Sequence, residues 1–187
     1  MANAQNVSAA KPPVGGAIYA APIGTTLPTD TDTALDAAFK SLGYVSDEGL
    51  TNTTNIESQN IKAWGGDTVL VTLTSKDDGF KFNLIESVDV DVLKSVYGDN
   101  NVSGDLTTGI SINVSSEDIP EKAYVIDMIM RGNIKKRICV PSAKISAIED
   151  IVYNDTDPVG YNITTDCTPD TYGNTHYEYI KKSGISG

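Results

Sequence analysis

Residues 64–99, WGGDTVLVTLTSKDDGFKFNLIESVDVDVLKSVYGD, decide the fold predicted for this chain. Residues 68–74 are rich in β-branched side chains and residues 80–84 alternate apolar and polar side chains, so both segments favour strands. Asp77-Asp78-Gly79 lies between them and has the composition of a turn, because glycine tolerates a positive φ and aspartate bonds to nearby backbone. The sequence therefore predicts a β-hairpin over residues 68–84.

After Glu86 the spacing of apolar residues changes to a helical period. Val88, Val92, Leu93 and Val96 fall on one helical face. Ser87 or Asp89 fits the N-cap, and Gly98 closes the far end. We therefore expect one short amphipathic helix from Asp89 to Tyr97 beside the sheet.

This region contains no chemically reactive motif. Its sequence nevertheless resembles one protein family. Residues 63–67, the hairpin, Ile85-Glu86 and residues 92–99 resemble the major tail (tail tube) proteins of long-tailed, siphovirus-type bacteriophages. Residues 42–50, LGYVSDEGL, resemble the same family at the expected place. The resemblance covers residues 15–99 well and is only general beyond Val102.

The resemblance implies a structural virion protein. Tail tube subunits form hexameric rings whose inner sheets join into a continuous barrel, and the rings stack into the channel for genome delivery into the host. The implied partners are further copies of the chain, the tape measure protein in the lumen, and the tail terminator and distal tail proteins. The resemblance also implies assembly in the bacterial host cytoplasm, location in the virion tail, and a contact with the next ring through Thr51–Lys62.

Length and charge limit the possible functions. The 187 residues suit one domain with tails, which we predict as a flexible N-terminal arm (1–14), a tail tube β-sandwich domain (15–168) and a C-terminal arm (169–187). A net charge of -11 opposes binding to nucleic acid and to anionic membranes. No apolar run is long enough for a membrane span, and the first residues do not resemble a signal peptide. DNA is therefore expected to pass without specific binding, and no membrane partner is expected.

The remaining pattern predicts a mainly β fold: an antiparallel β-sandwich or partly open barrel with one packed α-helix. An apolar stripe at Leu35, Ala38, Phe39 and Leu42 predicts a second, short helical turn. Residues 49–59 are rich in Asn and Thr, so they form either a loop or a protruding hairpin. Strands are further expected at residues 15–21, 44–46, 110–115, 124–130, 134–140, 144–152 and 160–167, with a helix as the alternative for residues 144–152. Residues 1–13 and the segment after Pro169 have no pattern, so each is a floppy tail or an arm that contacts a neighbouring subunit.

Three further features each have two interpretations. Trp64, the single tryptophan, is expected to be an anchor in the core or at an interface and not a ligand platform. The basic run Lys135-Lys136-Arg137 most simply lies on an exposed strand face, where it discourages edge pairing, and alternatively meets an acidic neighbouring subunit. Cys139 and Cys167 are expected to be reduced and buried.

No residues are predicted to be catalytic, cofactor-binding or metal-binding. His176 lies in the unpatterned C-terminal segment and is expected on the surface, without a carboxylate placed beside it. Residues 99–110 match part of an EF-hand loop, but Ile110 stands where a bidentate Glu is required. Two other functions remain possible at this point: a tube subunit of a contractile injection or type VI secretion apparatus, and a surface or carbohydrate-binding β-sandwich.

Overall fold

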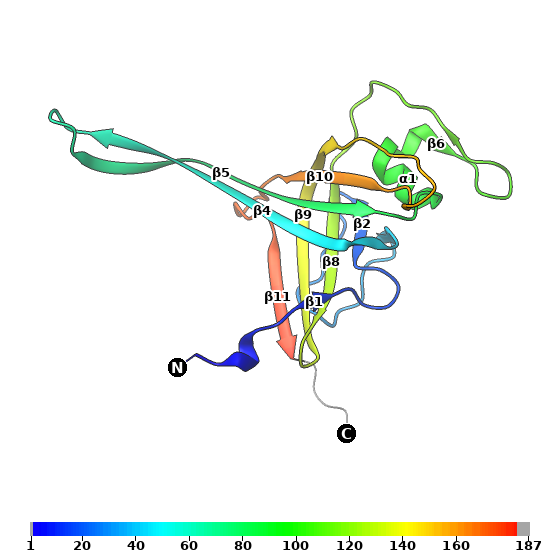
Figure 1. Ribbon diagram of the computed structural model, residues 1–187, viewed down its shortest axis with the longest axis horizontal. Helices are drawn as coiled ribbons and strands as arrows, with labels where there is room; N and C mark the ends of the chain where they lie inside the picture. The colour runs from blue at the N-terminus through cyan, green and yellow to red at the C-terminus, as the bar shows by residue number, and fades with distance from the viewer. Residues whose placement is uncertain (1, 183–187) are drawn as a thin grey trace.

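A computed structural model describes residues 2–182 of the chain (Figure 1). In chain order, the elements are the 3₁₀ helix η1 (Ala4–Asn6), β1 (Ala10–Lys11), β2 (Ile18–Pro22), β3 (Lys40–Ser41), β4 (Val45–Lys62), β5 (Thr68–Leu84), α1 (Val90–Tyr97), the 3₁₀ helix η2 (Asp99–Asn101), β6 (Val102–Ser103), β7 (Ser111–Ile112), β8 (Lys122–Met130), β9 (Ile134–Ile148), β10 (Tyr161–Cys167) and β11 (Tyr177–Lys182).

The described strands form one nine-stranded antiparallel sheet and a small β6-β7 ribbon. The main path of the sheet is β3-β2-β8-β9-β10-β5-β4; β1 also pairs with β8, and β11 pairs with β9. The sheet branches because the first half of β9 pairs with β11 and the second half pairs with β10. The strands β4, β5 and β10 cross over β8 and β9 (Figure 1), so the sheet folds over itself and stays open. The prediction of a mainly β, antiparallel fold with one packed helix is confirmed.

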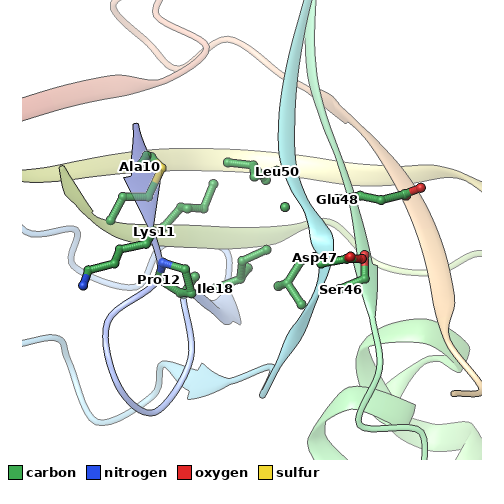
Figure 2. Close-up of a pocket in the computed structure, with 13 residues that line it drawn as sticks. Ala10, Lys11, Pro12, Ile18, Ser46, Asp47, Glu48 and Leu50 are labelled. Atoms are coloured by element: carbon green, nitrogen blue, oxygen red, sulfur yellow. The ribbon is translucent and has the colours of Figure 1, made fainter. Parts of the chain in front are cut away.

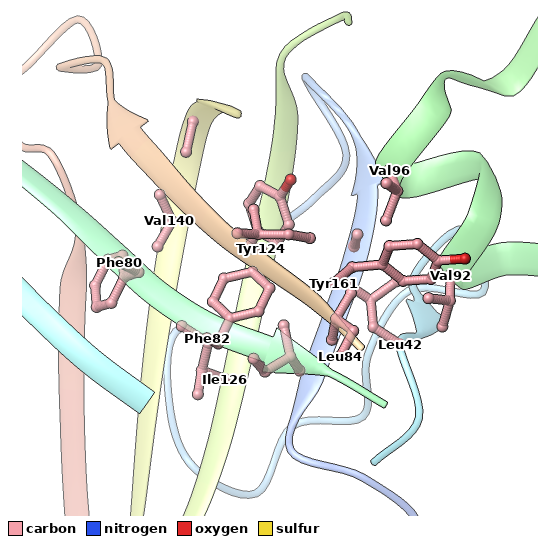
Figure 3. Packing of buried hydrophobic residues seen from close by; sticks show 14 of the residues in the cluster. Leu42, Phe80, Phe82, Leu84, Val92, Val96, Tyr124, Ile126, Val140 and Tyr161 are labelled. Atoms are coloured by element: carbon pink, nitrogen blue, oxygen red, sulfur yellow. The ribbon is translucent and has the colours of Figure 1, made fainter. Parts of the chain in front are cut away.

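The main core lies between the two crossing parts of the sheet (Figure 3). Phe82 of β5 contacts Tyr124 of β8 edge to face, with 6.5 Å between ring centroids. Val92 and Val96 of α1 are fully buried in the same cluster, so the helix closes one end of the core. A smaller cluster, made by Ala21, Phe39, Ala123, Val125 and Cys139, lies on the other face of β2, β8 and β9. Strand β8 is therefore covered on both faces.

The helix forms where the sequence predicts it. The Asp89 side chain accepts hydrogen bonds from the backbone N–H groups of Asp91 and Val92, and Gly98 ends the helix with a φ of 95°. A side-chain N-cap and a C-terminal glycine are local signals, so this prediction did not depend on long-range contacts.

The predicted hairpin over residues 68–84 is wrong, because β5 runs straight through Asp77-Asp78-Gly79. Its antiparallel partner is β4, and the chain reverses instead at residues 63–67. Gly79 serves close packing here: a Cβ at this position would lie 2.2 Å from the backbone oxygen of Thr165 in β10. For residues 49–59, the structure shows the protruding hairpin and not the loop.

The predicted helical turn at residues 35–42 is also wrong. The segment ends in the short strand β3, because Phe39 and Leu42 pack into different core clusters. A single helical stripe would point both side chains to one side, so the chain takes an extended path between the two clusters.

The two strands expected at residues 134–140 and 144–152 are one strand, β9. Pro141 breaks the pattern in the sequence, but it lies at a β-bulge where the pairing shifts from Val140–Tyr124 to Ala143–Lys122. A bulge removes the need for the ladder hydrogen bond that proline lacks. Of the strand expected at residues 110–115, only Ser111–Ile112 is formed.

Both terminal segments add strands to their own subunit. Ala10 and Lys11 pair with β8, and Tyr177–Lys182 pair with β9. The side chains of Tyr177 and Tyr179 pack on the smaller core cluster. Residues 1 and 183–187 of the predicted arms lie outside the described residues, and the domain boundaries at 15 and 168 remain a prediction.

Candidate assembly surface

A long two-stranded arm projects from the body (Figure 1). We define the arm as residues 55–77, which comprise the outer parts of β4 and β5 and the turn that joins them. All its side chains are exposed except Ser75, which is half-buried. An isolated two-stranded ribbon is marginally stable in water, so the arm lacks the packing that stabilises the rest of the sheet.

The tip of the arm is a defined turn that presents Trp64. The Gly66 N–H donates to the carbonyl of Ala63, and the Ala63 N–H donates to the carbonyl of Asp67. Gly65 has a φ of 115°, a backbone conformation that residues with a side chain rarely adopt. Trp64 is fully exposed, so the prediction of a core anchor is wrong and the interface role stays a prediction.

One face of the arm carries an apolar stripe of three β5 side chains, whereas the opposite face carries the single exposed apolar pair Leu70–Ile61. Val69, Val71 and Leu73 alternate with Thr68, Leu70 and Thr72, and strand geometry places alternate residues on the same face. Val71 and Leu73 are 60% and 59% exposed. In β4, Asn60, Ser58 and Ile56 lie on this same face, opposite Val71, Leu73 and Lys76.

Further along β4, this face reaches Asn52, which pairs with the buried Phe80. The core face of the sheet thus continues into solvent as the apolar stripe.

The outer edge of β4 is free within the described chain, since β4 ends the strand order and pairs only with β5. The strand has 18 residues, whereas β3 at the opposite end of the path has two. No proline interrupts β4, and no charged side chain lies between Gly49 and Ile56. Proline and charge are devices that keep edge strands from pairing, and this edge lacks both along its middle.

The base of the arm is fixed by the buried carboxylate of Asp78, whose side chain is 2% exposed. Asn52 and Thr54 of β4 donate to Oδ1 at 2.9 and 3.2 Å. Thr175 donates to Oδ2 at 2.8 Å, and Nδ1 of His176 lies 2.5 Å from the same oxygen. The carboxylate therefore links both strands at the base of the arm to the segment that precedes β11.

Burial raises the pKa of Asp78, but hydrogen bonds from Asn52 and Thr175 and the charge of His176 outweigh it, so the pKa is lowered from 3.8. The ring of His176 also lies edge to face against Phe80, with centroids 5.5 Å apart. The predictions of a surface His176 without a nearby carboxylate, and of a turn role for Asp78, are therefore wrong. The contact between Asp78 and His176 could not be predicted because the two residues are far apart in the sequence.

The basic run at residues 135–137 is paired within the subunit. Arg137 is buried, forms a two-pronged ion pair with Asp127 at 2.6 and 2.9 Å, and donates to the carbonyls of Asp30 and Thr33. Lys136 pairs with Glu178 of β11 at 2.7 Å. Lys135 is exposed, as interpreted, and pairs with Asp32 at 2.8 Å. The exposed interpretation is wrong for Arg137, and the edge-protecting role is wrong because β11 pairs with this part of β9.

The model for the family described as "Phage tail tube protein" matches residues 3–184. The chain belongs to this family. The match extends far beyond the residues 15–99 that carry the resemblance in the sequence. No curated protein matches the chain.

Family membership gives the chain a structural role in the phage tail tube, in which it self-assembles with other tail proteins, and places it in the virion tail. Tail tube proteins are a structural, non-enzymatic family. Among residues 2–182, no helix is long and apolar enough to cross a membrane, and no group of three potential metal ligands is present.

The two thiols of this tail tube protein are unpaired. Cys139 is buried as predicted, whereas Cys167 is only half-buried. Burial raises the pKa of each thiol to about 12, which suits structural cysteines and not reactive ones.

Proposed function

We propose that the chain forms the tail tube of a long-tailed, siphovirus-type bacteriophage as stacked hexameric rings, and that the arm makes the contact between subunits. The observation that carries this proposal is the apolar stripe on a projecting two-stranded arm. Val69, Val71 and Leu73 are exposed in the monomer, and burying them against another copy would supply the packing that the arm lacks. The arm includes most of Thr51–Lys62, the segment that the family resemblance assigns to the contact with the next ring.

Ring closure is proposed to use the free edge of β4. A long edge strand with free N–H and C=O groups pairs readily with another strand. In a closed ring each subunit pairs this edge with a different surface of its neighbour, so the contact repeats around the ring and growth stops at a fixed number of subunits. Siphovirus type and a hexamer follow from the resemblance of residues 64–99 and 42–50.

The net charge of -11 supports a role in genome delivery. A basic lumen would bind DNA phosphates and hold the genome in place, whereas an acidic lumen repels them and lets the DNA slide. We further propose that the lumen first holds the tape measure protein, that the tail terminator and distal tail proteins close the two ends, and that assembly takes place in the host cytoplasm.

Negative-stain electron microscopy and size-exclusion chromatography over a concentration series test this function. Rings or hollow tubes with a stain-filled channel are expected. Val71→Asp should abolish them, because it places a charge on the apolar stripe. Thr72→Asp is the matched control, since it adds the same charge one residue away on the opposite face, and should be tolerated.

A wild-type protein that stays monomeric at every concentration, even with other tail components added, would contradict the proposed function. Equal assembly of the Val71→Asp and Thr72→Asp variants would instead contradict the assignment of the apolar stripe. Circular dichroism of both variants verifies that the body stays folded.

A further inference from the structure

A shallow groove opens where β4 leaves its register with β5 (Figure 2). Val45 pairs with Leu84 and the next registered pair is Leu50 with Phe82, so residues 46–49 bulge away from the sheet. The groove has a volume of about 260 Å³ and lies between this bulge, β1 and the core face of β8. Small-molecule pockets typically measure about 300–1,000 Å³, so this one suits a single large side chain.

The groove combines an apolar floor with a charged rim. Ile18, Ile126 and Met128 contribute side chains to its lining. Lys11 lies on one side, and Asp47 and Glu48 lie on the other (Figure 2). All these residues lie on strands of the body, so the groove is already present in the isolated subunit.

The tip of the arm has the complementary features. Trp64 is a fully exposed indole on a hydrogen-bonded turn, flanked by Lys62 at the end of β4 and by Asp67 just before β5. Lys62 would face the acidic side of the rim, at Asp47, when Asp67 faces Lys11, so opposite charges would meet on both sides.

We propose that Trp64 at the arm tip of one copy inserts into this groove of a second copy. The occupant comes from another copy because the tip lies at the far end of the arm from its own groove (Figure 1). Tip and groove are different surfaces, so the contact is head to tail and propagates from subunit to subunit. A central aromatic anchor inside a ring of polar contacts is the usual composition of an interface hot spot. This inference rests on the proposed self-assembly and adds the site that receives the arm.

Tryptophan fluorescence tests the inference directly, because Trp64 is the only tryptophan in the chain. Monomer and assembled protein are compared by emission wavelength and by acrylamide quenching, and electron microscopy reports assembly independently. On assembly the emission should shift to shorter wavelength and the quenching constant should fall several-fold. Tubes in which Trp64 stays as exposed as in the monomer would overturn the inference and leave the proposed function standing. A wild type that never assembles would overturn both.

A charge exchange tests the groove itself. Lys62→Glu and Asp47→Lys should each raise the concentration needed for assembly about tenfold or more, because each brings like charges together. The double variant should recover most of that loss. Lys76→Glu is the matched control: it makes the same charge change on the same arm away from the tip, and Asp47→Lys should not rescue it. Burial of Trp64 without rescue of Lys62→Glu by Asp47→Lys would place the indole in another site and overturn the assignment.

Discussion

Replacing the buried carboxylate at the base of the arm should be among the most destabilising single changes in this protein. In Asp78→Ala, four side-chain donors lose their acceptor: Asn52, Thr54, Thr175 and His176. A hydrogen bond to a charged group contributes about 1.5–3 kcal/mol, but water can reach the exposed Asn52 and Thr54. Counting mainly the two contacts from the C-terminal segment, we expect a loss of about 3–5 kcal/mol. That is a large part of a typical total stability of about 5–15 kcal/mol.

Urea unfolding followed by far-ultraviolet circular dichroism measures this loss, at protein concentrations where only monomer is present. Asp77→Ala is the matched control, because Asp77 is the exposed neighbour on the opposite face of β5 and pairs with Asn55. The control should change the free energy of unfolding by no more than about 0.5 kcal/mol. If the two variants lose similar amounts, the carboxylate does not hold the base of the arm together and our reasoning is refuted.

The same carboxylate gives an acid dependence with a definite sign. The pKa of Asp78 is lowered from 3.8 in the folded protein, so its stabilisation is complete above that value and is lost as the pH falls through the lowered pKa. The difference in unfolding free energy between wild type and Asp78→Asn should therefore shrink as the pH falls from about 5 through 3.8. A difference that does not change over this range would contradict the charged state assigned to Asp78.

Three further predictions concern the body. Gly79→Ala should cost about 1–3 kcal/mol or more, measured as a lower Tm, because its Cβ would lie 2.2 Å from the Thr165 oxygen and force β5 and β10 apart; a Tm equal to wild type would contradict this packing. Arg137→Met should cost about 3–5 kcal/mol in urea unfolding by leaving Asp127 unpaired, whereas Lys144→Met, which breaks the exposed pair with Asp118, should cost less than about 1 kcal/mol. Cys139 and Cys167, each with a pKa of about 12, should not react with a thiol reagent at pH 8 until urea unfolds the protein; rapid labelling of the native protein would show that one of them is accessible.

The elements that the sequence predicts correctly carry their signals locally. Helix α1 has its N-cap Asp89 and its terminal Gly98 within its own segment. Strands β8 and β10 are bounded by turn residues and have an apolar pattern along their own length. β11 could have been found in the same way, because Tyr177 and Tyr179 alternate at the strand period and both pack on the core.

The predictions from the sequence fail where the role of a residue depends on a partner that is distant in the sequence. Gly79 resembles a turn glycine, but its reason is the backbone of Thr165 in β10. Arg137 resembles a surface cation, but Asp127 lies opposite it on β8 and neutralises it. His176 and Asp78 are 98 residues apart, and no local pattern connects them. The exposure of the arm could not be predicted for a related reason: residues 68–74 have the pattern of a core strand, but no other part of the described chain covers them.

The base and the outer part of the arm are stabilised by different contacts. The Asp78 cluster ties the base to the body through Thr175 and His176, which restricts the direction in which the arm projects. Beyond Asn55 the ribbon has only its own ladder hydrogen bonds, so its order would be completed by a neighbouring subunit. Because the base is preorganised, the arm loses less conformational entropy when its tip docks. The Asp78 cluster therefore strengthens the contact although it is not part of it. Loss of the Asp78 carboxylate should therefore weaken assembly as well as folding, even though Asp78 itself lies within the body and not on the proposed interface.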